Sequence, residues 1–162
     1  MRILIPIDNS TCSTAAIDAV ISQFHPVETE VRVLHVIAWP RDLSPSLTFA
    51  AGAAAADAVL SAHDRIRGQS RELVDRAVRR LAAAGFSATP HVLDGDPRHA
   101  IVEMAAEWPA DTIVIGSQGR HGWSRLLLGR VAEGIVRHAS CSVEVVRDRG
   151  AAVASGHQPR AS

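Results

Sequence analysis

The sequence predicts an α/β domain built on a parallel sheet of five strands, with helices on both faces of the sheet. The first observation is that five short apolar runs alternate with helix-like segments along the 162 residues. The second is that the segments between the runs are roughly a dozen residues or longer, which suits right-handed helical crossovers between parallel strands. The third is a hydrophobic content of 47%, enough for a buried core.

The first half of the chain supplies two strands and two helices. Residues 3–7 form an apolar strand that ends in a turn-and-cap cluster at residues 8–10, and apolar residues at helical spacing predict a helix over residues 11–24. Residues 31–37 predict the second strand, and residues 39–56 a mobile loop that grades into a long helix ended by Gly85. The apolar face of that helix comprises Val59, Ala62, Ile66, Leu73, Val74, Ala77, Val78 and Leu81.

The second half supplies the remaining three strands. Residues 88–93 predict a short strand, after which Asp96 as a cap and Pro97 at the first helical position begin a helix that runs through residue 107. Residues 112–115 are continuously apolar, which predicts a strand covered on both faces. A helix over residues 131–138 and a strand over 142–146 follow. We therefore expect one domain over residues 1–147 and a disordered tail over 148–162.

Charge and composition exclude several classes of protein. The chain has 17 arginines, no lysine and 17 acidic residues. The lack of lysine excludes an ordinary P-loop and a Schiff-base enzyme, and the neutral balance argues against nucleic-acid or membrane partners. No apolar run approaches the roughly 20 residues that span a bilayer, and the two cysteines lie far apart, so we expect a cytoplasmic protein. The histidines show no spacing typical of metal ligands, and we predict no metal site built by the protein.

A glycine-rich segment directly follows the fourth strand, with Gly116, Gly119 and Gly129 before the last helix. In parallel α/β sheets, ligands lie beyond the carboxyl ends of the strands, where the strand order reverses. Glycine amides and the positive end of a helix favour an anion such as a phosphate. Six arginines against three acidic residues over 116–149 favour the same charge of ligand. The motif therefore predicts a phosphate site without a lysine, and the alternative is a tight turn without a ligand.

Further motifs accompany the glycine spacing. They are Ile5-Pro6-Ile7-Asp8, Gly95-Asp96-Pro97, Leu126-Leu127-Leu128-Gly129 and Arg137-His138-Ala139. Over roughly residues 1 to 147, the combined pattern resembles the universal stress protein family. The resemblance implies a doubly wound sheet with strand order 3-2-1-4-5, commonly a homodimer, and one branch of the family binds ATP.

The resemblance also implies which residues meet the nucleotide. Asp8 would contact the ribose and base region, the Val36 backbone the adenine, and the three glycines the ribose and phosphates. ATP or another adenine nucleotide would bring any Mg²⁺ with it, held mainly by phosphates and water. With their neighbours, the implied nucleotide-binding residues are Pro6, Ile7, Asp8, Val36, Gly116, Ser117, Gly119, Arg120, Gly129, Arg130 and Val131.

Arg130 departs from the ATP-binding pattern of the family, which places serine or threonine directly after the last glycine and often another serine two residues later. Arg130 and Ala132 occupy those positions. Each absent hydroxyl would contribute about 1–2 kcal/mol as a hydrogen bond to a charged group. Arg130 either replaces them with a two-pronged contact to phosphate or fills the phosphate site with its own bulk.

Several of these residues also have a purely structural explanation. Asp8 fits as a helix cap, Ser117 as a turn residue and Gly129 as an ordinary helix entry. His35, inside the second strand, is better explained as a core or interface histidine than as a base. Cys141 is expected to pack as a small buried hydrophobe.

The sequence thus carries binding residues without an acid–base pair, an activated nucleophile or a metal triad, so we expect no enzyme, with slow nucleotide hydrolysis left open. The first hypothesis is a stress-response protein that binds an adenine nucleotide, ATP foremost, as a ligand-sensing switch. The alternative is a dimeric interaction scaffold in which Arg130 fills the site. The strand at 142–146 should form an exposed edge, and pairing of two such edges about a two-fold axis predicts a homodimer.

Overall fold

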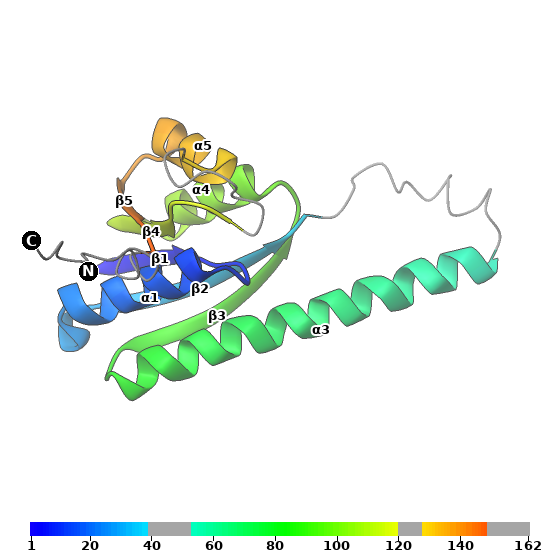
Figure 1. Cartoon of the computed structure of the whole chain (residues 1–162), viewed down its shortest axis with the longest axis horizontal. Helices are drawn as coiled ribbons and strands as arrows, with labels where there is room; N and C mark the ends of the chain where they lie inside the picture. Colours follow the sequence, from blue (N-terminus) through cyan, green and yellow to red (C-terminus); the bar gives the residue numbers. More distant parts are fainter. Residues whose placement is uncertain (39–52, 120–127, 149–162) are drawn as a thin grey trace, which may run out of the picture.

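A computed structural model of the chain describes residues 1–38, 53–119 and 128–148. Within these ranges, strands and helices alternate as predicted (Figure 1). The elements are β1 (Arg2–Pro6), α1 (Thr11–Gln23), the 3-10 helix η1 (Pro26–Glu28), β2 (Glu30–Ile37), α3 (Ala53–Ala83), β3 (Ser87–Asp94), α4 (Pro97–Glu107), β4 (Thr112–Gly116), α5 (Arg130–His138) and β5 (Ser142–Val146).

The five strands form one parallel sheet in the order β3-β2-β1-β4-β5, which confirms the predicted fold class and strand order. The chain runs outward from β1 to β2 and β3, and then returns to the other side of β1 with β4. The order therefore reverses between β1 and β4, and this is the position where a parallel α/β sheet opens to a ligand.

Two hydrophobic cores lie on opposite faces of the sheet. Ile3 and Ile5 of β1 point into the core beneath α1 and α3, whereas Leu4 points into the core beneath α4 and α5. Every residue of β4 is buried, which confirms that this strand is covered on both faces. The helices therefore fix the sheet from both sides and leave its carboxyl edge to form a site.

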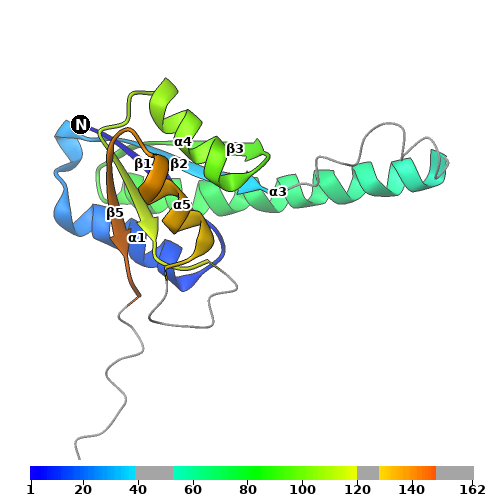
Figure 2. The ribbon, with the colours of Figure 1, turned by 90° about the horizontal axis from the view of Figure 1, so that it is seen from above.

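The helix α3 is much longer than the strand that follows it. Val74, Ala77 and Leu81 are buried against the sheet, but Leu60 is 62% exposed and Ile66 38% exposed. Only the later part of the predicted apolar face is therefore buried, because the first half of the helix extends past the end of the sheet (Figure 2).

An ion cluster ties this part of α3 to the end of β3. Asp94, the last residue of β3, accepts hydrogen bonds from His63 Nε2 at 2.8 Å and from Arg67 Nη1 at 2.6 Å. The predicted end of α3 is confirmed, because the helix ends at Ala83 and Gly85 follows two residues later with a φ of 90°.

The predicted start of α4 is confirmed in detail. The Asp96 carboxylate accepts from the amides of Arg98 at 3.0 Å and His99 at 3.1 Å, and Pro97 occupies the first turn. The His99 amide, and then the Arg98 side chain, lower the pKa of Asp96 below its ordinary value. The carboxylate is therefore the form that stabilises this helix end.

Two predictions concern segments that lie largely outside the described residues. Of the predicted loop over 39–56, residues 53–56 begin α3 and the rest lie outside the described residues. All of the predicted tail except Asp148 also lies outside them. No helix in the described part of the chain is long and apolar enough to cross a membrane.

Candidate functional site

A cleft with a volume of about 1340 Å³ opens at the carboxyl ends of β1, β2 and β4. Its walls come from α3 and the start of α1 on one side of the sheet, and from α4 and α5 on the other. The cleft brings together almost the whole predicted nucleotide-binding set: Pro6, Ile7, Asp8, Val36, Gly116, Ser117, Gly119, Gly129, Arg130 and Val131. The remaining member, Arg120, lies outside the described residues.

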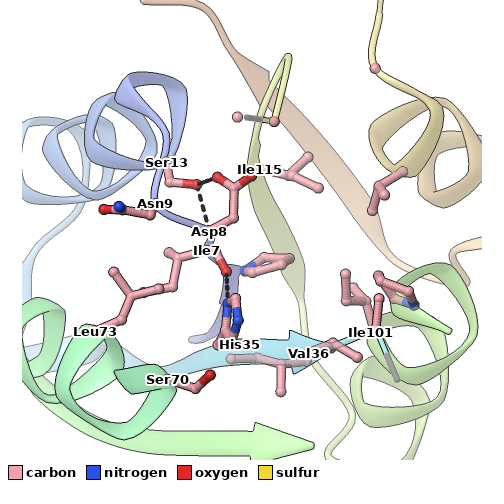
Figure 3. A pocket seen from close by; sticks show the side chains of 18 of the residues that line it. Ile7, Asp8, Asn9, Ser13, His35, Val36, Ser70, Leu73, Ile101 and Ile115 are labelled. Carbon is pink, nitrogen blue, oxygen red and sulfur yellow. Dashed lines mark hydrogen bonds between the residues drawn. The ribbon is translucent and has the colours of Figure 1, made fainter. Parts of the chain in front are cut away.

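Asp8 stands at the centre of the cleft, where β1 ends (Figure 3). Its amide donates to Ser13 Oγ at 2.9 Å, and Ser13 Oγ donates to Asp8 Oδ1 at 2.8 Å. The cap of α1 is instead Ser10, whose hydroxyl accepts from the Ser13 amide at 3.2 Å. Asp8 is thus not the helix cap, and its carboxylate is held in place by a side chain of the first turn.

A Cβ on any glycine of the motif would crowd a neighbouring atom. A Cβ on Gly119 would lie 2.8 Å from Asp8 Oδ2, and one on Gly129 would lie 3.2 Å from the Ser117 carbonyl oxygen. A Cβ on Gly116 would lie 2.7 Å from the backbone carbonyl carbon of Cys12. Gly119 therefore keeps open the space beside a carboxylate, whereas Gly116 lets α1 pack closely on β4.

The beginning of α5 adjoins the same segment. The Gly129 amide donates to the Ser117 carbonyl at 2.8 Å, and no side chain caps the helix at Gly129. Arg130, the first residue of α5, lines the cleft with an exposed side chain and pairs with no carboxylate among the described residues. The positive end of α5 and Arg130 therefore border the cleft, as does Arg76 of α3, an arrangement that attracts anions.

Successive side chains of β2 line opposite halves of the cleft. Val36 lies toward Ile101 of α4, whereas His35 lies toward Ser70 and Leu73 of α3 (Figure 3). The predicted core position of His35 is therefore wrong, because the residue is only partly buried and lines the cleft, where its Nδ1 donates to the Ile7 carbonyl at 2.8 Å.

The functional candidates absent from the predicted set are Ser13, His35, Ser70 and Leu73. Alternation along β2 was a usable signal for His35, because it separates neighbouring residues onto opposite faces. Ser13 had a signal too, since it follows the Ser10 cap by three residues. Ser70 and Leu73 had none, because only the tertiary position of α3 brings them to the cleft.

The other titratable candidates lie apart from this centre. No group of three or more histidine, cysteine, aspartate or glutamate side chains in the described ranges is arranged to hold a metal ion. Cys141 is partly buried and packs against the core beneath α4 and α5, and burial raises the pKa of its thiol. It therefore packs as a small hydrophobe, in agreement with the sequence prediction.

Comparison with known proteins places this chain among its relatives. The profile of the universal stress protein family matches residues 1–147. The chain is 30% identical over 146 residues to the universal stress protein MJ0531 of Methanocaldococcus jannaschii, an alignment that covers 90% of this chain and 81% of that protein.

Solved structures share the fold. The universal stress protein UspA of Lactobacillus plantarum is 25% identical, with a TM-score of 0.76 and coverage of 91% of this chain and 97% of that one. A universal stress protein family protein of Arabidopsis thaliana with AMP bound is 16% identical, with a TM-score of 0.68 and coverage of 96% of both chains. The sequence match, the sheet order and the glycine-lined cleft agree, and the chain belongs to the universal stress protein family.

Proposed function

We propose that the protein binds an adenine nucleotide, with ATP as the first candidate, and acts as a ligand-sensing switch in a stress response. The observation that carries this proposal is the position of Gly119, which keeps a Cβ out of the space beside the Asp8 carboxylate, while Gly129 lets the start of α5 approach the backbone of residues 117–119. The space lies at the reversal of strand order, and the structural relative from Arabidopsis thaliana has AMP bound.

The cleft accommodates each part of a nucleotide by chemistry. Phosphates suit the glycine segment and the positive end of α5, where Arg130 adds a charge. The Asp8 carboxylate suits the ribose hydroxyls, which donate hydrogen bonds. The base then lies across the end of β1, against the backbone of Val36 in β2.

We propose a binding protein rather than an enzyme. The Asp8 carboxylate is already held by Ser13, and any Mg²⁺ would enter on the phosphates with water as its other ligands. Hydrolysis by such a site would be slow, because a carboxylate beside the ribose does not activate a water at the terminal phosphate. We expect the protein in the cytoplasm, consistent with two free cysteines.

The test is isothermal titration of the purified protein with ATP and Mg²⁺, followed by the same titration of Asp8→Ala. We expect binding to the wild type and much weaker binding to the variant. Asp57→Ala is the matched control, because Asp57 is an exposed carboxylate of α3 outside the cleft lining. Absence of heat with the wild type, at concentrations that would reveal millimolar affinity, rejects the proposal.

A second candidate, a scaffold that binds no nucleotide, is favoured by one observation. Arg130 stands where the ATP-binding branch has a small hydroxyl residue, and its side chain borders the cleft. Arg130→Ser separates the two candidates. Stronger ATP binding by the variant shows that the arginine filled the phosphate site, and weaker binding shows that it contacts phosphate.

We also propose a homodimer formed through β5, an edge strand of the described sheet. Ser142 donates its amide to Asp111, and the Val146 carbonyl accepts from Ser117, so these residues direct their backbone groups toward β4. The backbone groups of Val143 and Val145 therefore point away from β4, where they can pair with β5 of a second copy of the chain. Val145→Pro removes one outward amide without touching the β4 ladder. Sedimentation should show a dimer for the wild type and a folded monomer for the variant, and a wild-type monomer at tens of micromolar contradicts the proposal.

A further inference from the structure

We propose that His35 is a positioning residue that keeps the backbone amide of Val36 open for the nucleotide base. This inference rests on the proposed function for the identity of the ligand, but its central claim concerns a hydrogen bond within the protein. The observation behind it is that the His35 ring, rather than the backbone of β2, donates to the Ile7 carbonyl at 2.8 Å (Figure 3).

The ladder between β1 and β2 shows which bond is replaced. In β2, Leu34 directs its carbonyl toward β1 and accepts from the Ile7 amide at 2.8 Å, whereas Ile37 directs its carbonyl toward β3 and accepts from Gly95 at 3.0 Å. Backbone groups alternate along a strand, so those of Val36 point toward β1. The next bond of a continued parallel ladder would run from the Val36 amide to the Ile7 carbonyl.

His35 donates to that acceptor in place of the Val36 amide. A carbonyl oxygen only accepts, so Nδ1 of His35 carries the proton that forms this bond. Among the described residues, the Val36 amide makes no hydrogen bond to a backbone acceptor on the β1 side. Val36 lines the cleft, so its amide opens onto the space in which the base would lie.

The peptide between Ile7 and Asp8 is thereby held at both ends by side chains. Its carbonyl accepts from His35, and its amide donates to Ser13 Oγ at 2.9 Å. These two bonds turn the peptide out of the sheet ladder at the point where β1 leaves for α1. A third bond, from the Ser13 hydroxyl at 2.8 Å, holds the carboxylate of Asp8.

An open amide and carbonyl on Val36 match one edge of adenine. The ring nitrogen beside the exocyclic amino group accepts from the amide, and the amino group donates to the carbonyl. In hypoxanthine or guanine this edge carries a carbonyl and a ring N–H, so donor faces donor and acceptor faces acceptor. The site therefore favours adenine only while the Val36 amide remains open, and this depends on His35.

The experiment is amide hydrogen exchange measured by NMR on the ligand-free protein, with His35→Phe as the variant. Phenylalanine keeps a planar ring and removes the donor to Ile7. In the wild type, we expect the Val36 amide to exchange at least about tenfold faster than the Leu34 amide of the same strand. In the variant, the Val36 amide closes onto the freed Ile7 carbonyl, and its exchange slows by about tenfold or more.

Nucleotide titration supplies the second arm. We expect His35→Phe to weaken ATP binding by about tenfold, the loss of one hydrogen bond, while inosine triphosphate binding changes little. His91→Phe is the matched control, because this partly buried histidine lies on the neighbouring strand β3 outside the cleft lining. It should leave both the exchange of Val36 and the ratio of the two affinities unchanged. A loss that reflected general damage would lower both affinities together.

The outcomes separate the two proposals. A Val36 amide that is as protected as Leu34 in the wild type overturns the role of His35, and this result does not require a folded variant. Unchanged exchange in a folded His35→Phe variant does the same. If exchange behaves as expected but ATP does not bind the wild type, the role in keeping the amide open stands and the proposed nucleotide function fails.

Discussion

Gly119→Ala isolates the contribution of the space beside Asp8 to ligand binding. The added Cβ would lie 2.8 Å from Asp8 Oδ2, closer than carbon and carboxylate oxygen can approach. The carboxylate must therefore turn away, although the Ser13 hydroxyl holds its other oxygen at 2.8 Å. Weakening this bond costs the protein about 0.5–1.5 kcal/mol of folding free energy.

The effect on binding should be larger than the effect on folding. A displaced Asp8 loses its hydrogen bond to the ribose, a bond to a charged group worth about 1.5–3 kcal/mol. The dissociation constant for ATP should therefore rise roughly ten- to hundredfold. Isothermal titration measures the affinity, and urea unfolding of the same samples measures the stability.

Gly68→Ala provides the matched control. A Cβ on Gly68, in the middle of α3, would have no heavy atom within 4 Å. The substitution should leave ATP affinity unchanged and stabilise the protein by about 0.5–1 kcal/mol, because glycine is costly inside a helix. If Gly119→Ala binds ATP as tightly as the wild type, the Asp8 carboxylate does not face the ligand and the reasoning is wrong.

Three further predictions concern stability and titration. Gly116→Ala should lower the free energy of unfolding by about 1–3 kcal/mol, because the added Cβ would lie 2.7 Å from the Cys12 backbone, which moves less easily than a side chain. An unchanged midpoint of urea unfolding contradicts this prediction. Asp96→Ala should cost about 1 kcal/mol and Asp96→Asn much less, since both aspartate and asparagine cap helices. The pKa of Asp96 is lowered in the folded protein, so its carboxylate stabilises the fold fully above the ordinary pKa of aspartate. This contribution to the free energy of unfolding is lost as the pH falls through the lowered pKa. An acid titration of stability should show the loss in the wild type and not in Asp96→Ala. The pKa of His91 is lowered first by burial and then by the charge of Arg32, so Arg32→Gln should raise the pKa of His91 only part of the way to its ordinary value, as NMR titration can measure.

The sequence was sufficient for the order of elements and for most of the site. Continuous apolar runs and cap residues are local signals, and the strands at residues 3–7 and 112–115 and the cap at Asp96 are predicted from them directly. The cleft lining followed because parallel strands end at one edge of the sheet, which brings Asp8 and Gly119 together from opposite ends of the chain.

The features that could not be predicted from the sequence depend on which residues distant in the chain come together in the fold. The length of α3 beyond the sheet is set by where the sheet ends, so the exposure of Leu60 and Ile66 has no local signal. Arg32 stacking on the Trp108 ring at 4.5 Å joins β2 to the end of α4, and no spacing rule connects these two residues. The hydrogen bond from His35 to Ile7 likewise replaces a ladder bond that the sequence alone would have predicted.

The proportions of α3 have a mechanical consequence. Its 31 residues make a rod of about 46 Å, whereas the 8 residues of β3 reach about 26 Å. One segment of this rod, at Ser70 and Leu73, forms a wall of the cleft, and Asp94 binds the rod nearby through His63 and Arg67. The later turns of the helix are anchored by their buried face, whereas the first turns project beyond the sheet as an arm whose apolar Leu60 the sheet leaves uncovered.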